Sequence, residues 1–325
     1  MTLASGIGSH PGDDQHAFVE ALRFVLGELS LPYLPEVPGR GPGADMVGRS
    51  LALLSGLGAD LQPAGWRLGS SSGVDHRRAI SLLNQDLDSL EEATQGFSGV
   101  LKVQVCGPWT LAASVERPRG DRVLADVGAR RELAESLAEG LSAFVAGLRR
   151  RVPGASLLVQ VDEPALPAVL AGSVPTASGF HRHRSVDVPL AAPALELVLS
   201  SISSAGASPV VHCCAPDMPF DLLSRVGAPG ISVDLDVLTA SSYDGVAAAL
   251  EEDRWVLLGV VPSLRPSALP TARSVTNRVE RFLDMVGLEP SDKLGLTPSC
   301  GLAGADPAWA RTALELCRSA AADLS

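Results

Sequence analysis

The chain has 325 residues, of which 46% are hydrophobic, and a formal net charge of −11. This length is compatible with one large α/β barrel or with two smaller domains. The negative charge and the shortness of the basic runs exclude an extended phosphate-binding surface, so we expect no nucleic-acid partner and no membrane partner.

The amino-terminal segment has no basic stretch followed by an apolar core, and no later run reaches 18 apolar residues. Five cysteines, an odd number that includes the adjacent pair Cys213 and Cys214, are a poor basis for a disulfide framework. We therefore expect a reduced, cytoplasmic protein whose cysteines pack in the core, catalyse or bind a metal.

Short β-branched runs that end in Gly, Pro, Asp, His or Cys predict eight strands. Their ranges are 4–8, 31–35, 101–106, 156–162, 209–213, 231–234, 255–260 and 294–298. Stretches with helical spacing of apolar residues lie in most gaps, at 17–29, 124–148, 192–201, 243–250, 275–286 and 308–321. This alternation predicts an α/β fold, a (β/α)8 TIM barrel that forms a single domain over residues 1–325.

An open doubly wound sheet is the alternative fold, but the chain lacks the glycine fingerprint that such sheets use to bind phosphate. Residues 58–74 are rich in Gly and Ser. They predict an excursion from the barrel, either a hairpin or a lid.

Three residues with soft ligand atoms follow two of the predicted strands. If the strand continues through Cys213, alternation places His212 and Cys214 on one face. Cys300 follows the last strand, and Gly301 allows the backbone to turn tightly there. Both segments would open onto the carboxyl-terminal face, where barrel enzymes carry their chemistry.

An imidazole and two thiolates suit tetrahedral zinc, and three protein ligands leave one position for a substrate thiol, which the cation would deprotonate. The alternative for each residue is a buried cysteine or a hydrogen-bonded histidine without metal. Cys106 and Cys317 are interpreted as core residues, and Cys213 is expected to point away from the metal.

Seven segments, taken in order, resemble the catalytic half of cobalamin-independent methionine synthase. They are 7–11, 45–47, 107–111, 160–166, 212–214, 231–234 and 298–302. The resemblance implies a (β/α)8 barrel that binds zinc and methylates homocysteine at sulfur to form methionine. It also implies that His212, Cys214 and Cys300 are the zinc ligands.

The resemblance further implies roles for five other residues. Asp234 stands where the family has a fourth metal ligand, a Glu that is one methylene longer; Asp234 would reach the metal through a water or would cap the next turn. Ile7, Gly8 and Ser9 would bind the substrate carboxylate, and Asp162 would bind its ammonium. Glu163, on the other face of the strand, is expected to be structural.

The chain departs from the family at four places. The loop 68–73 replaces a family folate contact, and Ser114 replaces a tryptophan, for which the nearby Trp109 is expected to compensate as a substrate-binding residue. The segment 38–43 lacks a family acid that holds the ammonium, and 261–263 lacks the family catalytic His.

A methyl group on cobalt needs no proton donor when it leaves. The missing His therefore predicts a methylcorrinoid donor, such as methylcobalamin or a corrinoid protein, in place of methyltetrahydrofolate. Two alternatives stay open, a zinc alkyltransferase for another thiol such as coenzyme M and a non-catalytic zinc or thiol sensor. Asp162 favours an amino-acid thiol.

Overall fold

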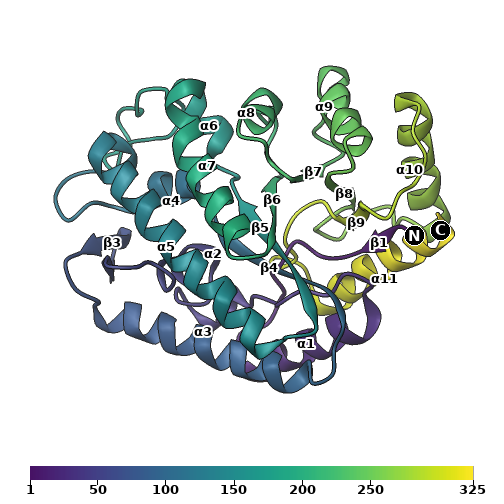
Figure 1. Cartoon of the computed structure of the whole chain (residues 1–325), viewed down its shortest axis with the longest axis horizontal. Coiled ribbons are helices and arrows are strands. Elements are labelled where there is room, and N and C mark those ends of the chain that lie inside the picture. The colour runs from purple at the N-terminus through teal and green to yellow at the C-terminus, as the bar shows by residue number, and fades with distance from the viewer. Residues whose placement is uncertain (325) are drawn as a thin grey trace.

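A curled sheet of seven parallel strands forms the centre of the molecule (Figure 1), in a computed structural model that describes residues 1–324, the side chain of residue 241 excepted. The strand order is β1, β9, β8, β7, β6, β5, β4. Their bounds are β1 Leu3–Ala4, β4 Gly99–Cys106, β5 Ala155–Asp162, β6 Ser208–Cys213, β7 Gly230–Asp234, β8 Trp255–Val261 and β9 Leu294–Pro298.

The extended segment 31–36 closes the sheet between its two edges. On one side, the Leu31 N–H donates to the Ala4 carbonyl of β1 over 3.0 Å. On the other side, the Lys102 N–H of β4 donates to the Pro32 carbonyl over 2.9 Å, and Tyr33 forms a parallel bridge with Lys102. Seven of the predicted strands form the sheet and the eighth, 31–35, is an extended segment between its edges, so the predicted (β/α)8 fold is confirmed.

The first strand is shorter than the predicted range 4–8, because β1 ends at Ala4. The carbonyl of Ile7 accepts hydrogen bonds from the Lys102 and Gln160 side chains instead of from a neighbouring strand. Side chains from the barrel interior thus replace the ladder at Ile7, whereas Ser5 still bonds to Leu296 of β9 and Gly8 to Glu36 through the backbone.

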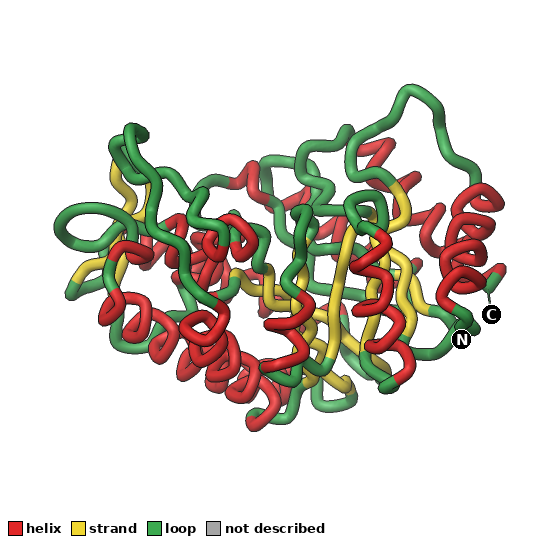
Figure 2. The backbone as a smooth tube through the Cα atoms, turned by 90° about the horizontal axis from the view of Figure 1, so that it is seen from above, coloured by secondary structure: helices red, strands yellow, loops and turns green. Residues whose placement is uncertain are grey.

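Helices surround the barrel, as the view from above shows (Figure 2). Their bounds are α1 Gln15–Glu28, α2 Met46–Leu51, α3 Val74–Ala93, α4 Pro108–Ser114, α5 Val127–Arg151, α6 Leu166–Leu170, α7 Val188–Ser204, α8 Phe220–Arg225, α9 Ala240–Glu251, α10 Ala272–Val286 and α11 Pro307–Asp323. Several begin where an aspartate side chain accepts a backbone N–H, as Asp14 does for α1 and Asp126 for α5. Local sequence therefore fixes these helix starts.

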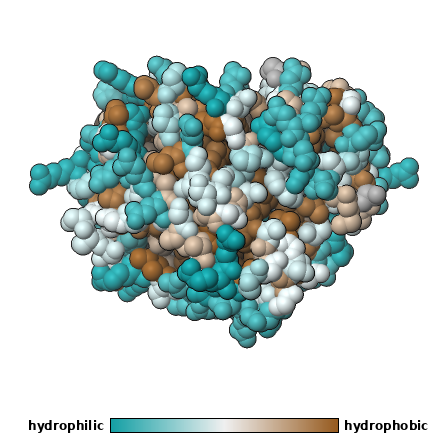
Figure 3. All heavy atoms as spheres, in the orientation of Figure 1, coloured by the Kyte–Doolittle hydropathy of each residue, from teal (hydrophilic) through white to brown (hydrophobic). Residues whose placement is uncertain are grey.

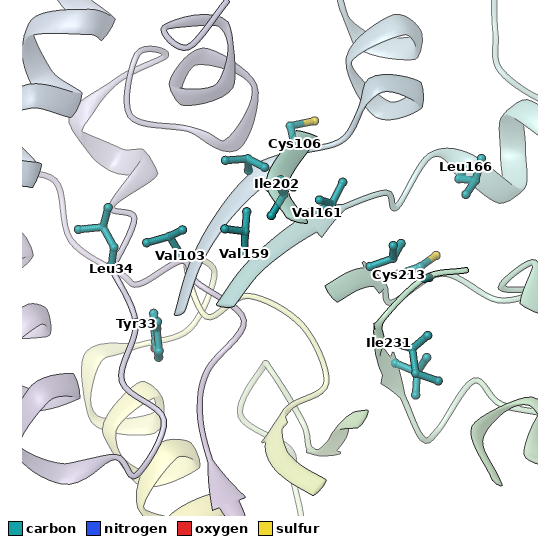
Figure 4. Close-up of a cluster of buried hydrophobic side chains, with 14 of the residues drawn as sticks. Tyr33, Leu34, Val103, Cys106, Val159, Val161, Leu166, Ile202, Cys213 and Ile231 are labelled. Atoms are coloured by element: carbon teal, nitrogen blue, oxygen red, sulfur yellow. The ribbon is translucent and has the colours of Figure 1, made fainter. Parts of the chain in front are cut away.

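Alternation along the strands separates two environments. Val103, Val159 and Val161 lie in the large apolar cluster between the barrel and its helices (Figure 4). A second, smaller cluster contains Leu158 and Leu257, from two different strands. The remaining interior positions toward the carboxyl end carry buried polar side chains, among them Lys102, Gln104, Gln160, Asp162, His212, Ser232 and Thr297. Polar side chains therefore line the carboxyl end of the barrel interior.

The predicted excursion is a two-stranded antiparallel hairpin, β2 Gly58–Gln62 and β3 Gly65–Gly69. Backbone hydrogen bonds join Trp66 and Leu68 to Glu116, and the Trp66 side chain is buried. The hairpin lies at the edge of the molecule (Figure 1). Of the two alternatives, a hairpin or a lid, the structure shows a hairpin that packs against the rest of the protein.

Hydrophobic residues on the face shown in Figure 3 are scattered among hydrophilic ones. Among residues 1–324, no helix has both the length and the apolar character needed to cross a bilayer.

Candidate metal centre and substrate cavity

A cavity of about 300 Å³ opens at the carboxyl end of the barrel. Segments far apart in the chain line it: Ile7, Gly8, Ser9, Glu36, Pro38, Asp45, Met46, Gln104, Asp162, Pro164, His212, Cys214, Cys300 and Gly301. Its volume is at the lower end of the range for small-molecule sites, about 300–1,000 Å³. A small substrate, not a polymer, fits such a space.

His212 reaches this cavity from the end of β6. Its Nδ1 atom lies 2.9 Å from the Ser232 hydroxyl on the neighbouring strand β7. Its Nε2 atom is buried and has no hydrogen-bond partner among residues 1–324. An orphaned nitrogen of this kind is costly unless a ligand satisfies it, and Ser232 holds the ring so that Nε2 is presented.

The two thiols complete the group. The Sγ atoms of Cys214 and Cys300 lie 3.0 Å apart, and one ligand atom from each of these residues and from His212 lies within 4.8 Å of the others. The hydrogen bond between the two thiols lowers the pKa of the Cys300 thiol and raises the pKa of Cys214. Either sulfur can be the donor of this hydrogen bond, so the pair favours the loss of one proton.

This group fits a soft divalent cation on chemical grounds. An unpartnered imidazole nitrogen and two adjacent sulfurs are the donor set of tetrahedral zinc sites, and three ligands leave a fourth position open toward the cavity. Their positions at strand ends predicted that these three residues lie close together, and in the structure they do.

The other cysteines lie outside this group. Cys106 and Cys317 are fully buried in the apolar core, as predicted. Cys213 is also in the apolar cluster, where its thiol faces the Ala215 carbonyl, and burial raises its pKa to about 11. It points away from the metal centre, which confirms the alternation argument.

Asp234, the fourth ligand that the sequence suggested, is not part of the three-residue group. It ends β7, and its Oδ1 atom accepts a hydrogen bond of 2.9 Å from the Asp236 N–H. The carboxylate thus caps the following turn, and its contact with a metal through a water stays a prediction.

The residues expected to bind an amino acid line the cavity. The backbone N–H groups of Gly8 and Ser9 make no hydrogen bond with residues 1–324, and Ser9 Oγ accepts from the Ala303 N–H. A Cβ on Gly301 would lie 2.2 Å from Ser9 Oγ. Glycine is required at 301 for this close approach, not for a tight turn.

Asp162 lies at the end of β5 and also lines the cavity. It is 5% exposed, and its Oδ1 atom accepts a hydrogen bond of 2.7 Å from Gln160 Nε2. Burial raises its pKa to about 6, although His212 and Gln160 act in the other direction. The cavity therefore offers both backbone donors and a carboxylate.

Glu36 is a second carboxylate that sequence reasoning missed. No acid occupies 38–43, but Glu36 lies just before that segment and lines the cavity. Burial raises its pKa to about 7 against the effect of Arg49, whose Nε lies 3.6 Å away. The signal was its place directly after the strand 31–35, at the carboxyl edge of the barrel.

Gln104 was also missed. Its Nε2 atom donates to the Leu34 carbonyl over 2.7 Å and to Glu36 Oε1 over 3.2 Å. Its Oε1 atom is buried without a partner in the described part of the chain. Together with Glu36 and Asp162 it gives the cavity three acceptor groups and therefore a preference for a cation such as an ammonium.

Trp109, which the sequence suggested as a substrate-binding residue, does not line this cavity. It lies in the first turn of α4, and its indole N–H donates to the Ala191 carbonyl over 3.1 Å. Its backbone N–H and that of Thr110 donate to the Glu163 carboxylate over 2.9 and 2.8 Å. Glu163 therefore caps α4, which confirms its structural role, and this cap holds Trp109 in its outer position.

The loop 68–73, Ser114 and the segment 261–263 also lie off the cavity, since none of them is among its lining residues. At 261–263, the Ser263 N–H donates to Ser299 Oγ, and the Pro262 carbonyl accepts from the Trp309 indole. His212 is the sole histidine among the lining residues that are described, so the structure shows no second imidazole at this place.

A parallel α/β barrel with a His-Cys-Cys group and an acceptor-rich cavity at its carboxyl edge defines the chain as a barrel enzyme with a candidate metal centre. The sequence model of the family described as "Cobalamin-independent synthase, Catalytic domain" matches residues 97–323. The chain therefore belongs to this family, and it is a methyltransferase of the methionine synthase type.

One solved structure supports the fold. A B12-independent methionine synthase from Shewanella sp. W3-18-1, in complex with selenomethionine, aligns with a TM-score of 0.65 and 15% identity over 98% of this chain and 96% of that chain. A D-allulose 3-epimerase from Methylomonas sp. aligns with a TM-score of 0.36 and 12% identity over 84% of this chain and 94% of that one, too weakly to bear on function. A comparison with curated proteins gave no significant match.

Both the family and the Shewanella enzyme are described as independent of cobalamin. The expected methylcorrinoid donor, whether methylcobalamin or a corrinoid protein, is therefore corrected. The error arose because the lack of a histidine at 261–263 was interpreted as a change of donor.

Proposed function

We propose that this methyltransferase methylates the thiol of homocysteine and that His212, Cys214 and Cys300 hold a zinc ion for this purpose. Zinc is typical of the family. When bound at these three ligands, zinc would keep a substrate thiol in its thiolate form at neutral pH. The observation that carries the proposal is the position of this group in the same small cavity as the acceptors Glu36, Gln104 and Asp162.

The chain's own residues would bind and orient the amino acid. The N–H groups of Gly8 and Ser9 are free to bind the carboxylate, and Ser9 Oγ can donate to it as well. Glu36, Gln104 Oε1 and Asp162 would accept the three N–H bonds of the ammonium. The side chain of homocysteine would then extend toward Cys214 and Cys300, with its sulfur as the reacting atom.

This arrangement discriminates between the thiols considered. Coenzyme M carries a sulfonate and no ammonium, so it would leave Glu36 and Asp162 without a cationic partner. An unpaired buried carboxylate costs several kcal/mol, on the order of 3–5. The cavity therefore favours an α-amino-acid thiol.

Methyltetrahydrofolate is the donor that we propose to test first, since it is the donor that the family uses. Zinc-loaded protein is incubated with homocysteine and methyltetrahydrofolate without cobalamin, and methionine is measured by mass spectrometry. We expect methionine to form in proportion to enzyme. Parallel reactions replace the folate by methylcobalamin, or homocysteine by coenzyme M.

Methionine formed from methylcobalamin alone would refute methyltetrahydrofolate as the donor. Methylation of coenzyme M faster than that of homocysteine would refute homocysteine as the substrate. If no thiol is methylated from either donor while zinc is bound stoichiometrically, homocysteine methylation itself is refuted for these donors.

A further inference from the structure

Lys102 is a fully buried lysine beneath the substrate cavity. Its side chain projects from β4 into the barrel interior and is 0% exposed. Of the 26 basic side chains in the sequence, only Lys102 and Lys293 are lysines, and all others are arginines. An ammonium in this position, in a chain that otherwise uses guanidinium groups, points to a requirement for a compact charge with three rotatable donors.

Lys102 joins two segments that are distant in sequence. Its Nζ atom donates to the Ile7 carbonyl and to Gln160 Oε1, each over 2.9 Å. The Nζ atom also lies 5.0 Å from the centre of the Tyr33 ring. Burial lowers the pKa of this lysine to about 7, while the charges of Asp162 and Glu36 act to raise it.

Gln160 extends the connection to Asp162. Because an ammonium can only donate, the Gln160 atom that faces Lys102 must be the oxygen. The amide nitrogen is therefore turned toward its other neighbours, and it donates to the Ile7 carbonyl over 2.9 Å and to Asp162 Oδ1 over 2.7 Å. Lys102 thus determines which way the Gln160 amide faces, and through it the position of the Asp162 carboxylate.

The same contacts orient the turn at Ile7. The Ile7 carbonyl and the Gly8 N–H belong to one planar trans peptide and point in opposite directions. Two donors, Lys102 and Gln160, hold the carbonyl toward the barrel interior. The Gly8 N–H is consequently directed away from them, and Gly8 lines the cavity.

We propose that Lys102 is a positioning residue that holds the Ile7–Ser9 turn and the Asp162 carboxylate at a fixed separation, which makes the cavity selective for thiols that carry an α-amino-acid group. This inference rests on the proposed function, because it assumes that the turn binds the carboxylate and that Asp162 binds the ammonium. Lys102 itself does not touch the substrate in this arrangement.

The test compares Lys102→Met with Lys293→Met, the same chemical change at the other lysine. Lys293 precedes β9 at the amino end of the barrel, where its Nζ lies 4.7 Å from the Trp255 ring centre. Methionine binding is measured by titration calorimetry, which needs no turnover. We expect the Kd to rise by about tenfold or more in Lys102→Met, as for other residues that orient ligand-binding groups, and to stay near the wild-type value in Lys293→Met.

A second readout separates positioning from a general loss of structure. The ratio of kcat/KM for homocysteine to that for propanethiol, which lacks both charged groups, should fall by about tenfold or more in Lys102→Met, mainly through KM. A damaged barrel would lower both values together. An unchanged ratio, with unchanged methionine affinity, would overturn the inference.

If Lys102→Met folds poorly, Gln160→Met tests the same hydrogen-bonded unit. If both single variants fold, the double variant completes a double-mutant cycle. Because both residues act in one hydrogen-bonded unit, the double variant should bind methionine no more weakly than the worse single variant. Fully additive losses would contradict the coupling. Wild-type protein that binds no methionine would overturn the proposed function and this inference with it, whereas wild-type affinity in Lys102→Met would overturn the inference alone.

Discussion

The sulfur atoms of Cys214 and Cys300 lie 3.0 Å apart, although 86 positions separate the two residues in the chain. Cys214 follows β6 and Cys300 follows β9, and two strands, β7 and β8, stand between these in the sheet. The curvature of the barrel brings the ends of these strands together over one point. A metal bound there would link two distant parts of the barrel, so its retention tests the site directly.

Cys300→Ser should lose the metal. Removing one of three protein ligands is expected to weaken zinc affinity by at least ~100-fold, more than the loss of an outer-shell partner. Zinc content is measured by mass spectrometry after dialysis against a weak chelator. Cys213→Ser is the matched control, because Cys213 neighbours the site in sequence but points into the apolar cluster. Stoichiometric zinc in Cys300→Ser would rule out this centre.

Ser232→Ala tests how His212 is held. The hydroxyl of Ser232 is 2.9 Å from His212 Nδ1, and without it the ring loses the partner that fixes its orientation. We expect zinc affinity to fall by about 10–100-fold, with little change in folding. Thr297→Val is the control, because the buried Thr297 hydroxyl has no hydrogen-bond partner among residues 1–324. Equal affinities in the two variants would show that Ser232 plays no part in metal binding.

The sequence was sufficient for most of the strands and for the proximity of His212, Cys214 and Cys300. His212 lies near the end of β6, and Cys214 and Cys300 follow β6 and β9. Because parallel barrel strands end on one face, position at a strand end is enough to predict proximity.

The polar interior could not be predicted in the same way. Residues 101–105 alternate apolar and polar, a pattern that is typical of a strand with one face in water. In the structure both faces are buried, because Leu101, Val103 and Val105 pack in the apolar core while Lys102 and Gln104 lie in the barrel interior. Alternation shows that a strand has two faces, but only the closed sheet shows that the polar one is also buried.

Glu36 predicts how ligand binding depends on pH. Its pKa is raised to about 7, so it loses its negative charge as the pH falls through 7, and an ammonium is then bound less tightly. Between pH 7.5 and 6 we expect methionine affinity to fall by up to ~10-fold per pH unit. Lys102 also has a pKa near 7, so the Glu36→Gln variant is needed to assign the effect.

In Glu36→Gln, methionine affinity at pH 7.5 should already be low and should vary less between pH 7.5 and 6, as calorimetry at several pH values would show. Below pH 6, Asp162, whose pKa is raised to about 6, should account for most of the pH dependence of methionine affinity. A pH profile identical to that of the wild type would show that Glu36 does not bind the ammonium.

Replacing Asp86, which lies outside the cavity, should strongly lower the stability of the protein. Its carboxylate is 0% exposed and binds Arg40 through two hydrogen bonds of 2.8 Å, and it also binds Arg49. Asp86→Asn would leave two buried guanidinium groups without a full counter-charge. We expect the free energy of unfolding to fall by about 3–5 kcal/mol, measured by urea denaturation. Asp88→Asn is the control, because Asp88 lies on the same helix, is 67% exposed and pairs with Arg151, which predicts a loss below ~1 kcal/mol.

The Asp86→Asn substitution should also weaken ligand binding in the cavity. Arg40 and Arg49 belong to the segment that includes Pro38, Asp45 and Met46, which line the cavity. Because Asp86 on α3 anchors this segment, Asp86→Asn should weaken methionine binding in protein that is still folded, whereas Asp88→Asn should leave the affinity unchanged. Equal losses of stability in the two variants would show that the buried ion pairs contribute no more than an exposed one.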